Sequence, residues 1–267
     1  MKRFSRMLEH DEPFPLQLCE SLLNSSKQTI AENGLLAALS RLGRQRLLAS
    51  CEHVEFRVAD VPGRAGERIK HVHFPIDSII STVTALADGS RLEVGLVGHE
   101  GMLGSAVALG FSVSPQHAIV QGAGGAWRMS TSAFQQHTRD SVEVSQLLNC
   151  YLYVQMGQLA QTAACSHYHR VQARLARWLL MTRDRARCAE FELTQEFLAH
   201  LLGVRRVGIT KAASSLREQG LIDYRRGAIA ILDEAGLEQA SCACYRRAND
   251  MYERALGGPG SRGRMRR

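Results

Sequence analysis

Residues 191–232 read FELTQEFLAHLLGVRRVGITKAASSLREQGLIDYRRGAIAIL and contain two short helical segments separated by a glycine. Thr194 is suited to cap a first helix over 195–202, because its hydroxyl can accept from the free amides of the first turn. Gly203 can adopt the left-handed conformation that ends a helix and begins a tight turn. A second helix is predicted over 205–219, before another glycine. This pattern predicts a helix-turn-helix.

The second helix has one apolar face and one polar, basic face. The side chains expected to point inward are Val207, Ile209, Ala212, Ala213 and Leu216. Those expected to point outward are Arg205, Arg206, Gly208, Thr210, Lys211, Ser214 and Arg217. The basic residues gather near the N-terminus of the helix, which is the end that enters a DNA major groove in helix-turn-helix proteins.

Two apolar runs, 221–224 and 228–232, follow the second helix and predict a β-hairpin, the wing. Arg225, Arg226 and Gly227 form its turn, and the two arginines suit phosphate contacts, which position a protein on DNA without reading its sequence. Arg206 and Lys211 are the candidates for contacts to guanine. The residues better suited to phosphate oxygens are Gln195, Arg205, Thr210 and Ser214. The alternative is an unrelated αα-hairpin with a basic surface, but the coincidence of helix lengths, glycine turn and wing favours the winged helix-turn-helix.

The positive charge of the chain is confined to its C-terminal part. The 267 residues carry a net charge of +7. Residues 1–169 contain 14 basic and 15 acidic residues, whereas residues 170–267 contain 19 basic and 11 acidic residues. A basic part joined to a neutral part indicates that one domain meets a polyanion while the other has a different role.

Residues 54–130 consist of short apolar runs separated by glycine-rich turns, for example around 79–84, 92–97 and 118–122. This pattern predicts a compact antiparallel barrel or sandwich, flanked by helices. The second flank reads as one long amphipathic helix over 132–165. Because it is longer than a small barrel needs, we expect it to pair with a second copy of the chain. The side chains predicted to form that dimer contact are Val144, Leu147, Leu148, Tyr151, Val154 and Leu159. The alternative is a core helix packed within one subunit.

Seven scattered cysteines in a chain without an export signal predict reduced thiols in a cytoplasmic protein. The chain has no C-x-x-C motif, and the close pair Cys242 and Cys244 has no neighbouring pair in the sequence to complete a tetrahedral metal site. We therefore expect no metal and no other cofactor. No apolar run is long enough for a membrane-spanning helix.

These residues resemble the cyclic-AMP receptor and fumarate-nitrate regulator (Crp/Fnr) family, most strongly in LTQEFLAHLLGVRRVGITKAASSLREQGLI, HFPIDSIIS and EVGLVGHEGMLG. The resemblance implies an α+β homodimeric transcription regulator that binds a palindromic operator in double-stranded DNA and contacts RNA polymerase. It divides the chain into an N-terminal extension (1–29), a cyclic-nucleotide-binding-like antiparallel β-barrel of jelly-roll type (30–131), a dimerisation helix (132–165), a winged helix-turn-helix (166–240) and a C-terminal helix with a flexible basic tail (241–267).

The chain departs from this family at the effector pocket. The resemblance places the pocket at His99, Glu100, Gly101, Gln116 and His117. Members that bind cyclic nucleotides have an Arg-Ser pair where Gln116 and His117 stand here, so a phosphodiester loses its bidentate cationic partner. We expect that cyclic AMP is not the effector, unless Arg128 turns inward to replace the cation. The oxygen-sensing members use clustered N-terminal cysteines, of which this chain has only Cys19, so an iron–sulfur sensor is not expected.

The recognition helix departs as well. Members that read a TGTGA-like half-site have a glutamate where Val207 follows Arg206, so their half-site does not transfer to this chain.

The enzyme alternative rests on His71 and His73, which share one face of a predicted strand, as ligands do in metal-binding cupins. A cupin needs further ligands, and the sequence offers only Asp77 and His99. His167 and His169 near Cys165 resemble a sensor cluster, but we interpret them as a polar hinge before the DNA-binding domain. The balance of these patterns predicts a DNA-binding regulator and not an enzyme.

Overall fold

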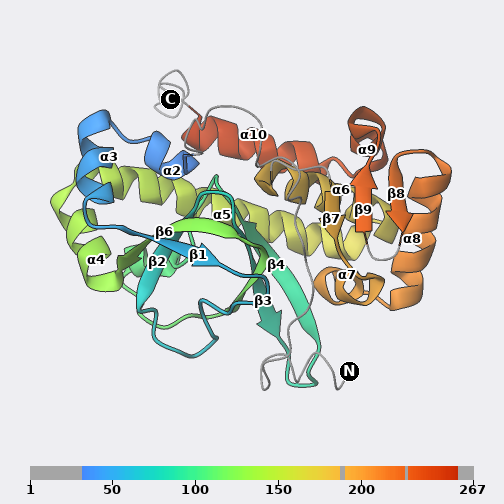
Figure 1. Cartoon of the computed structure of the whole chain (residues 1–267), viewed down its shortest axis with the longest axis horizontal. Coiled ribbons are helices and arrows are strands. Elements are labelled where there is room, and N and C mark those ends of the chain that lie inside the picture. The colour runs from blue at the N-terminus through green and yellow to red at the C-terminus, as the bar shows by residue number, and fades with distance from the viewer. Residues whose placement is uncertain (1–31, 187–189, 226–227, 258–267) are drawn as a thin grey trace.

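The computed structural model describes residues 32–186, 190–225 and 228–257. The predicted N-terminal extension and the basic tail lie outside these ranges. The described chain has an α+β fold in which helices cover two small sheets and a third sheet lies among the C-terminal helices (Figure 1). None of the described helices is long and apolar enough to cross a bilayer.

Six strands form two three-stranded antiparallel sheets. The first has the order β1 (Glu52–Phe56), β6 (Gly124–Ser130), β2 (His71–Pro75), and the second has the order β4 (Arg91–Val97), β3 (Ile79–Ala85), β5 (His117–Gly122). The sheets meet across the buried side chains Ile80, Ala118 and Val120, against which Phe56 and Leu103 pack.

The sheets are not closed into a barrel, so the predicted β-barrel is corrected to two separate sheets. Residues 57–70 form no strand of their own: they make isolated bridges, such as Gly63 with Ala118 of β5, and scattered backbone hydrogen bonds, such as that from the amide of Ala59 to the carbonyl of Val120. Pro62 has no N–H to donate, and glycine is a weak strand former. A continuous ladder along this segment is therefore disfavoured.

Helices pack against one side of these sheets: α2 (Gly34–Ala37), α3 (Arg41–Leu48), the 3-10 helix η2 (Ser105–Leu109), α4 (Thr131–Asp140) and α5 (Val142–Tyr168). Buried Asn33 fixes the first of them: its side chain accepts from the amides of Leu35 and Leu36 and donates to the carbonyls of Pro75 and Gly101. Both the oxygen and the nitrogen of its side-chain amide therefore have hydrogen-bond partners, as a buried polar group requires.

The helix predicted as continuous over 132–165 is two helices, α4 and α5. Ser141 between them is extended, with φ −128° and ψ 111°, and its hydroxyl accepts from the amide of Val144 at 3.3 Å. Ser141 thus caps the N-terminus of α5, and its extended backbone separates α4 from α5. An interruption of a single residue leaves the apolar spacing nearly unchanged, which is why periodicity alone did not show it.

The C-terminal part contains α6 (Val171–Ala186), α7 (Gln195–Leu202), α8 (Arg206–Glu218), α9 (Glu234–Ala240) and α10 (Cys244–Leu256). A third sheet has the order β7 (Glu190–Glu192), β9 (Ala228–Ile231), β8 (Ile222–Arg225). The helix α10 lies along α5 (Figure 1), and its end, at Ala255 and Leu256, belongs to the same buried core as Leu35, Phe74 and Val144. The C-terminal helix therefore connects the two parts of the molecule.

Candidate DNA-binding surface and ligand cavity

The two helices α7 and α8 form a helix-turn-helix. The hydroxyl of Thr194 accepts from the amide of Phe197 at 3.2 Å, and Gly203 ends α7 in the left-handed conformation with φ +61°. Ile209 and Leu216 bury the inner face of α8 in the core of this domain. The sequence thus predicted the bounds of α7, and those of α8 to within one residue.

The outer face of α8 is basic and polar. The predicted DNA-binding residues that lie exposed on α8 or at its N-cap are Arg205, Arg206, Thr210, Lys211, Ser214 and Arg217. Two predictions were wrong. Val207 was expected inward but is 58% exposed, and Gly208 was expected outward but faces Val171, which a Cβ at Gly208 would approach to 3.8 Å. The helical repeat explains both, because position 207 shares its face with 210, 211 and 214.

Gln195 holds the two helices together at the exposed surface. The hydroxyl of Thr210 donates to the side-chain oxygen of Gln195 at 2.6 Å. The two side chains predicted separately as phosphate ligands are therefore one hydrogen-bonded pair between the start of α7 and the second turn of α8.

The predicted wing hairpin consists of β8 and β9, paired from Ile222 with Ile231 to Arg225 with Ala228. Asp223 forms ion pairs with Arg225 at 2.9 Å and with Arg217 at 3.4 Å, so it links the wing to the end of α8. Both arginines remain largely exposed beside the outer face of α8. Arg226 and Gly227 at the turn lie outside the described residues.

Residues 173–240 match the family model of the Crp-like helix-turn-helix domain. The C-terminal part of the chain therefore contains a Crp-like helix-turn-helix domain. No curated protein matches it in sequence.

Solved structures of bacterial transcription regulators share the fold over most of the chain. FixK2 of Bradyrhizobium japonicum is 16% identical, with a TM-score of 0.62, and the match covers 72% of this chain and 98% of FixK2. The c-di-GMP-responsive regulator CLP of Xanthomonas campestris is 15% identical, with a TM-score of 0.61 and coverage of 73% and 100%. A CRP-family regulator of Thermus thermophilus is 20% identical, with a TM-score of 0.58 and coverage of 70% and 96%. At this identity the likeness concerns the fold alone.

A cavity of about 240 Å³ lies in the N-terminal part of the chain, between β3, β4, η2, α5 and α10. Of the five predicted pocket residues, Glu100 and Gln116 line it, whereas His99, Gly101 and His117 do not. No lysine, arginine or histidine is among the described residues that line it. The cavity thus offers a bound anion no cationic side chain.

The space beside Gly101 is filled by Tyr151, which explains why this glycine is not part of the cavity wall. A Cβ at Gly101 would lie 2.3 Å from the Tyr151 hydroxyl oxygen. That hydroxyl accepts from the amide of Met102 at 3.0 Å and from the side-chain amide of Gln155 at 3.2 Å. Arg128 does not replace the missing cation, because it is paired with Glu52 at 2.8 Å and does not line the cavity.

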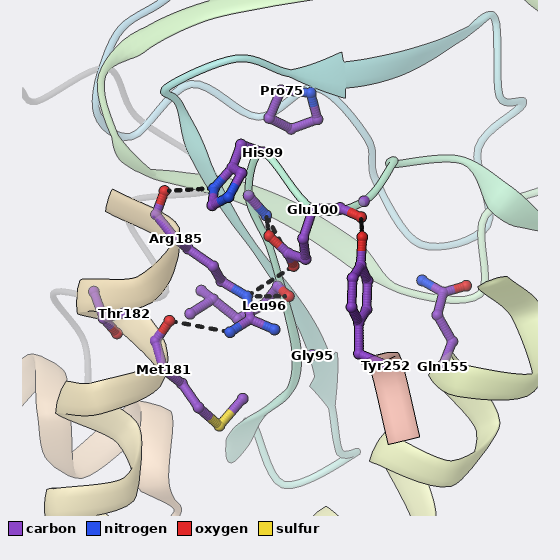
Figure 2. A network of polar contacts seen from close by, with 12 residues as sticks. Pro75, Gly95, Leu96, His99, Glu100, Gln155, Met181, Thr182, Arg185 and Tyr252 are labelled. Atoms are coloured by element: carbon purple, nitrogen blue, oxygen red, sulfur yellow. Dashed lines mark hydrogen bonds and ion pairs between the residues drawn. The ribbon is translucent and has the colours of Figure 1, made fainter. Parts of the chain in front are cut away.

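Glu100 connects the cavity to the DNA-binding part through Arg185 of α6 (Figure 2). The Arg185 Nε lies 2.9 Å from a carboxylate oxygen of Glu100 and donates to the carbonyl of Leu96 at 3.1 Å. On the other side, the Tyr252 hydroxyl of α10 donates to the Glu100 carbonyl at 2.6 Å. Arg185 and Tyr252 were not predicted as site residues, because nothing in their sequence positions indicates which loop they reach.

A second carboxylate, that of Glu93 on β4, is partly buried and contacts the same helix α6. The indole N–H of Trp178 donates to Glu93 at 2.8 Å, and the hydroxyl of Ser81 donates to its other oxygen. Burial raises the pKa of Glu93 to about 7. Both carboxylates therefore place the sheet β3–β4 directly against the first helix of the DNA-binding part.

His71 and His73, on which the prediction of a metal enzyme rested, form no metal centre with other described residues. Neither His71 nor His73 belongs to a group of three or more side chains of metal-ligand type within the ranges that the structure describes. His73 is buried beside Phe56, and its pKa is lowered to about 4, mainly by burial and also by the charge of His71. Nothing in this arrangement favours a cupin-like site.

The side chains predicted to form a dimer contact are mostly covered by their own chain. Val144, Leu147, Leu148, Tyr151 and Val154 are buried in a core that they share with strands β2 and β6 and helices α4 and α10. This corrects the prediction, and only Leu159, which is 42% exposed, remains accessible. A different stripe of α5 is exposed, with residues spaced alternately by four and three: Val142, Gln146, Asn149, Tyr153, Met156, Ala160 and Ala163.

Proposed function

We propose that this chain is a homodimeric transcription regulator that binds a palindromic operator and does not respond to cyclic AMP. DNA binding is supported by the outer face of α8, where Arg205, Arg206 and Lys211 are exposed beside the wing. Guanidinium and ammonium groups at the N-terminal end of a recognition helix are suited to base edges and phosphates in the major groove. Contact with RNA polymerase is part of the proposal and rests on the family resemblance.

The exposed stripe of α5 supports the homodimer. Its spacing of four and three residues is the repeat by which two helices pack along a shared seam. Tyr153 and Met156 lie at its centre and are 55% and 70% exposed. Exposed apolar side chains in such a row are suited to burial against a second copy related by a two-fold axis.

Selection from random double-stranded DNA tests this function. A two-fold dimer places its recognition helices about 34 Å apart, one turn of DNA. We therefore expect the full chain to enrich an inverted repeat, and we expect one DNA duplex to bind two chains in sedimentation experiments. Enrichment of single half-sites, or of no sequence, would contradict the proposal.

Cyclic AMP is expected to bind at least about 30-fold more weakly than it binds relatives with an arginine in the pocket, because a buried phosphate without its charged partner loses about 2–5 kcal/mol. The cavity supplies Gln116 as a neutral side chain, and its one acidic residue, Glu100, is paired with Arg185. Calorimetry of the purified protein with cyclic AMP, cyclic GMP and cyclic di-GMP measures this directly. A low-micromolar Kd for cyclic AMP together with tighter DNA binding would show the prediction to be wrong.

A further inference from the structure

Three cysteines and one histidine that are distant in the sequence come together where α5 ends. Cys165 and His169 lie one helical turn apart, Cys242 lies between α9 and α10, and Cys244 is the first residue of α10. The three sulfur atoms and a ring nitrogen of His169 all lie within 4.8 Å of one another. Across the residues that the structure describes, no other group of three or more such side chains is this close.

The distances fit a tetrahedral metal ion. Zinc–sulfur and zinc–nitrogen bonds of about 2.3 Å and 2.0 Å place neighbouring ligand atoms of a tetrahedron about 3.4–3.8 Å apart. The Sγ atoms of Cys165 and Cys242 are 3.5 Å apart, and the Sγ of Cys244 is 3.5 Å from the Nδ1 of His169. Two of the distances between ligand atoms therefore already match a tetrahedral site, and the remaining ones are no longer than 4.8 Å.

We propose that Cys165, His169, Cys242 and Cys244 bind one zinc ion in a closed Cys₃His site. Thiolate sulfur favours soft or borderline metals, and three thiolates with one imidazole are a ligand set typical of structural zinc. This proposal departs from the expectation that the chain binds no metal. Spacing along the chain does not indicate the site, because only the fold brings the Cys-x-Cys pair against the Cys-x₃-His pair at the end of α5.

The charges around the cluster suit this ligand set. Zinc with three thiolates carries one net negative charge, and a buried charge needs a partner. Arg174 and Arg177 are both buried beside the cluster, and the Nε of Arg177 has no hydrogen-bond partner among the described residues. Both guanidinium groups lie close enough to act electrostatically on the Cys165 thiol.

Gln161 provides a further support for the site. It lies one turn before Cys165 on α5, and its side-chain amide donates to the Sγ of Cys244 at 2.9 Å. Donors of this kind orient a thiolate ligand and stabilise its charge. Gln161 is therefore a positioning residue for the zinc site.

The site joins two parts of the molecule. His169 is the C-cap of α5, immediately before α6 begins the DNA-binding part. Cys242 and Cys244 lie beyond residue 240, where the matched helix-turn-helix segment ends. A zinc ion at this point ties the hinge after α5 to the start of α10, and so fixes the C-terminal helix along α5.

Metal analysis and cobalt titration of the full-length protein test the proposal. We expect the protein purified under reducing conditions to contain about one zinc per chain. After removal of zinc, Co²⁺ should give the thiolate charge-transfer and visible bands of a tetrahedral, sulfur-rich site, and Zn²⁺ should abolish them. Cys244→Ser should weaken cobalt binding by more than about 100-fold, because loss of a ligand exceeds loss of a supporting contact. Cys150→Ser, on the same helix but outside the cluster, is the matched control and should bind as the unmodified chain does.

A second variant covers the case in which Cys244→Ser does not fold. Gln161→Ala keeps all four ligands and should weaken cobalt binding by about 10-fold or more, whereas Gln158→Ala on the same helix should not. The proposal is overturned if cobalt gives no tetrahedral spectrum, if Cys244→Ser binds cobalt like the unmodified chain, or if the isolated protein contains an iron–sulfur cluster. A Cys165–Cys242 disulfide in the isolated protein, found by mass spectrometry of unreduced peptides without zinc, would overturn it as well.

Discussion

Arg206→Ala is expected to weaken binding to the selected operator by about 5- to 150-fold, because a good bidentate contact to a base contributes about 1–3 kcal/mol. Arg206 is the first residue of α8 and is exposed beside Val207 and Thr210, on the face that would enter the groove. Its loss should also relax the base preference at one position of each half-site. Competition assays with single-base variants of the operator measure both effects.

Arg225→Ala in the wing is the control for this experiment. Arg225 is far more exposed than the Asp223 carboxylate it contacts, and Arg217 still pairs with that carboxylate when Arg225 is removed. The variant should weaken operator and random DNA alike and lower the slope of the salt dependence by about one unit. If both variants change specificity equally, Arg206 is not the base-reading residue.

The DNA-binding part could be predicted from the sequence because its signals are local. A hydroxyl at Thr194, glycines at 203 and 220, and the apolar spacing of α8 each act within a few residues of their own position. The sequence predicted Val207 on the buried face of α8 and Gly208 on the exposed face, and the structure has the reverse. The predicted apolar face was therefore rotated by about one residue around the helix. The wing strands were predictable for the same local reason, but β7, which pairs with β9, is only three residues long and has no distinct pattern.

The N-terminal part was predicted less well because its form depends on contacts between distant residues. Individual strands follow from apolar runs, but closure into a barrel depends on whether residues 57–70 pair continuously, and they do not. The cavity wall also depends on Tyr151, which reaches across to Gly101 and Met102 from α5. No spacing along the sequence indicates such a contact.

The two faces of α5 illustrate the limit of periodicity most clearly. Both the buried row, including Val144 and Leu148, and the exposed row, including Tyr153 and Met156, have helical spacing. A periodic pattern shows that a helix has an apolar face but not which molecule covers it. The same limit hid the Cys₃His cluster, because Cys165 and Cys242 are 77 residues apart and meet only through the packing of α10 on α5.

Met156→Glu is expected to convert the proposed homodimer to a monomer and to weaken binding to the selected operator by about 100- to 10,000-fold. In a dimer, the second half-site is bound at the high effective concentration that linkage provides, and a monomer loses this gain. Met156 lies at the centre of the exposed stripe of α5, so a two-fold axis would place two glutamates close together in an apolar seam, where like charges repel and lose hydration.

Leu109→Glu is the matched control, because Leu109 is similarly exposed, at 59%, but belongs to η2 and not to the α5 stripe. It should leave both the sedimentation coefficient and the operator affinity unchanged. Sedimentation velocity measures the loss of dimerisation, and electrophoretic mobility shifts on full and half operators measure the loss of DNA affinity. Because the core face of α5 is untouched, Met156→Glu should keep its circular dichroism spectrum and still bind a half-site with the affinity of one chain. A Met156→Glu protein that remains dimeric would mean that copies of this chain associate through another surface.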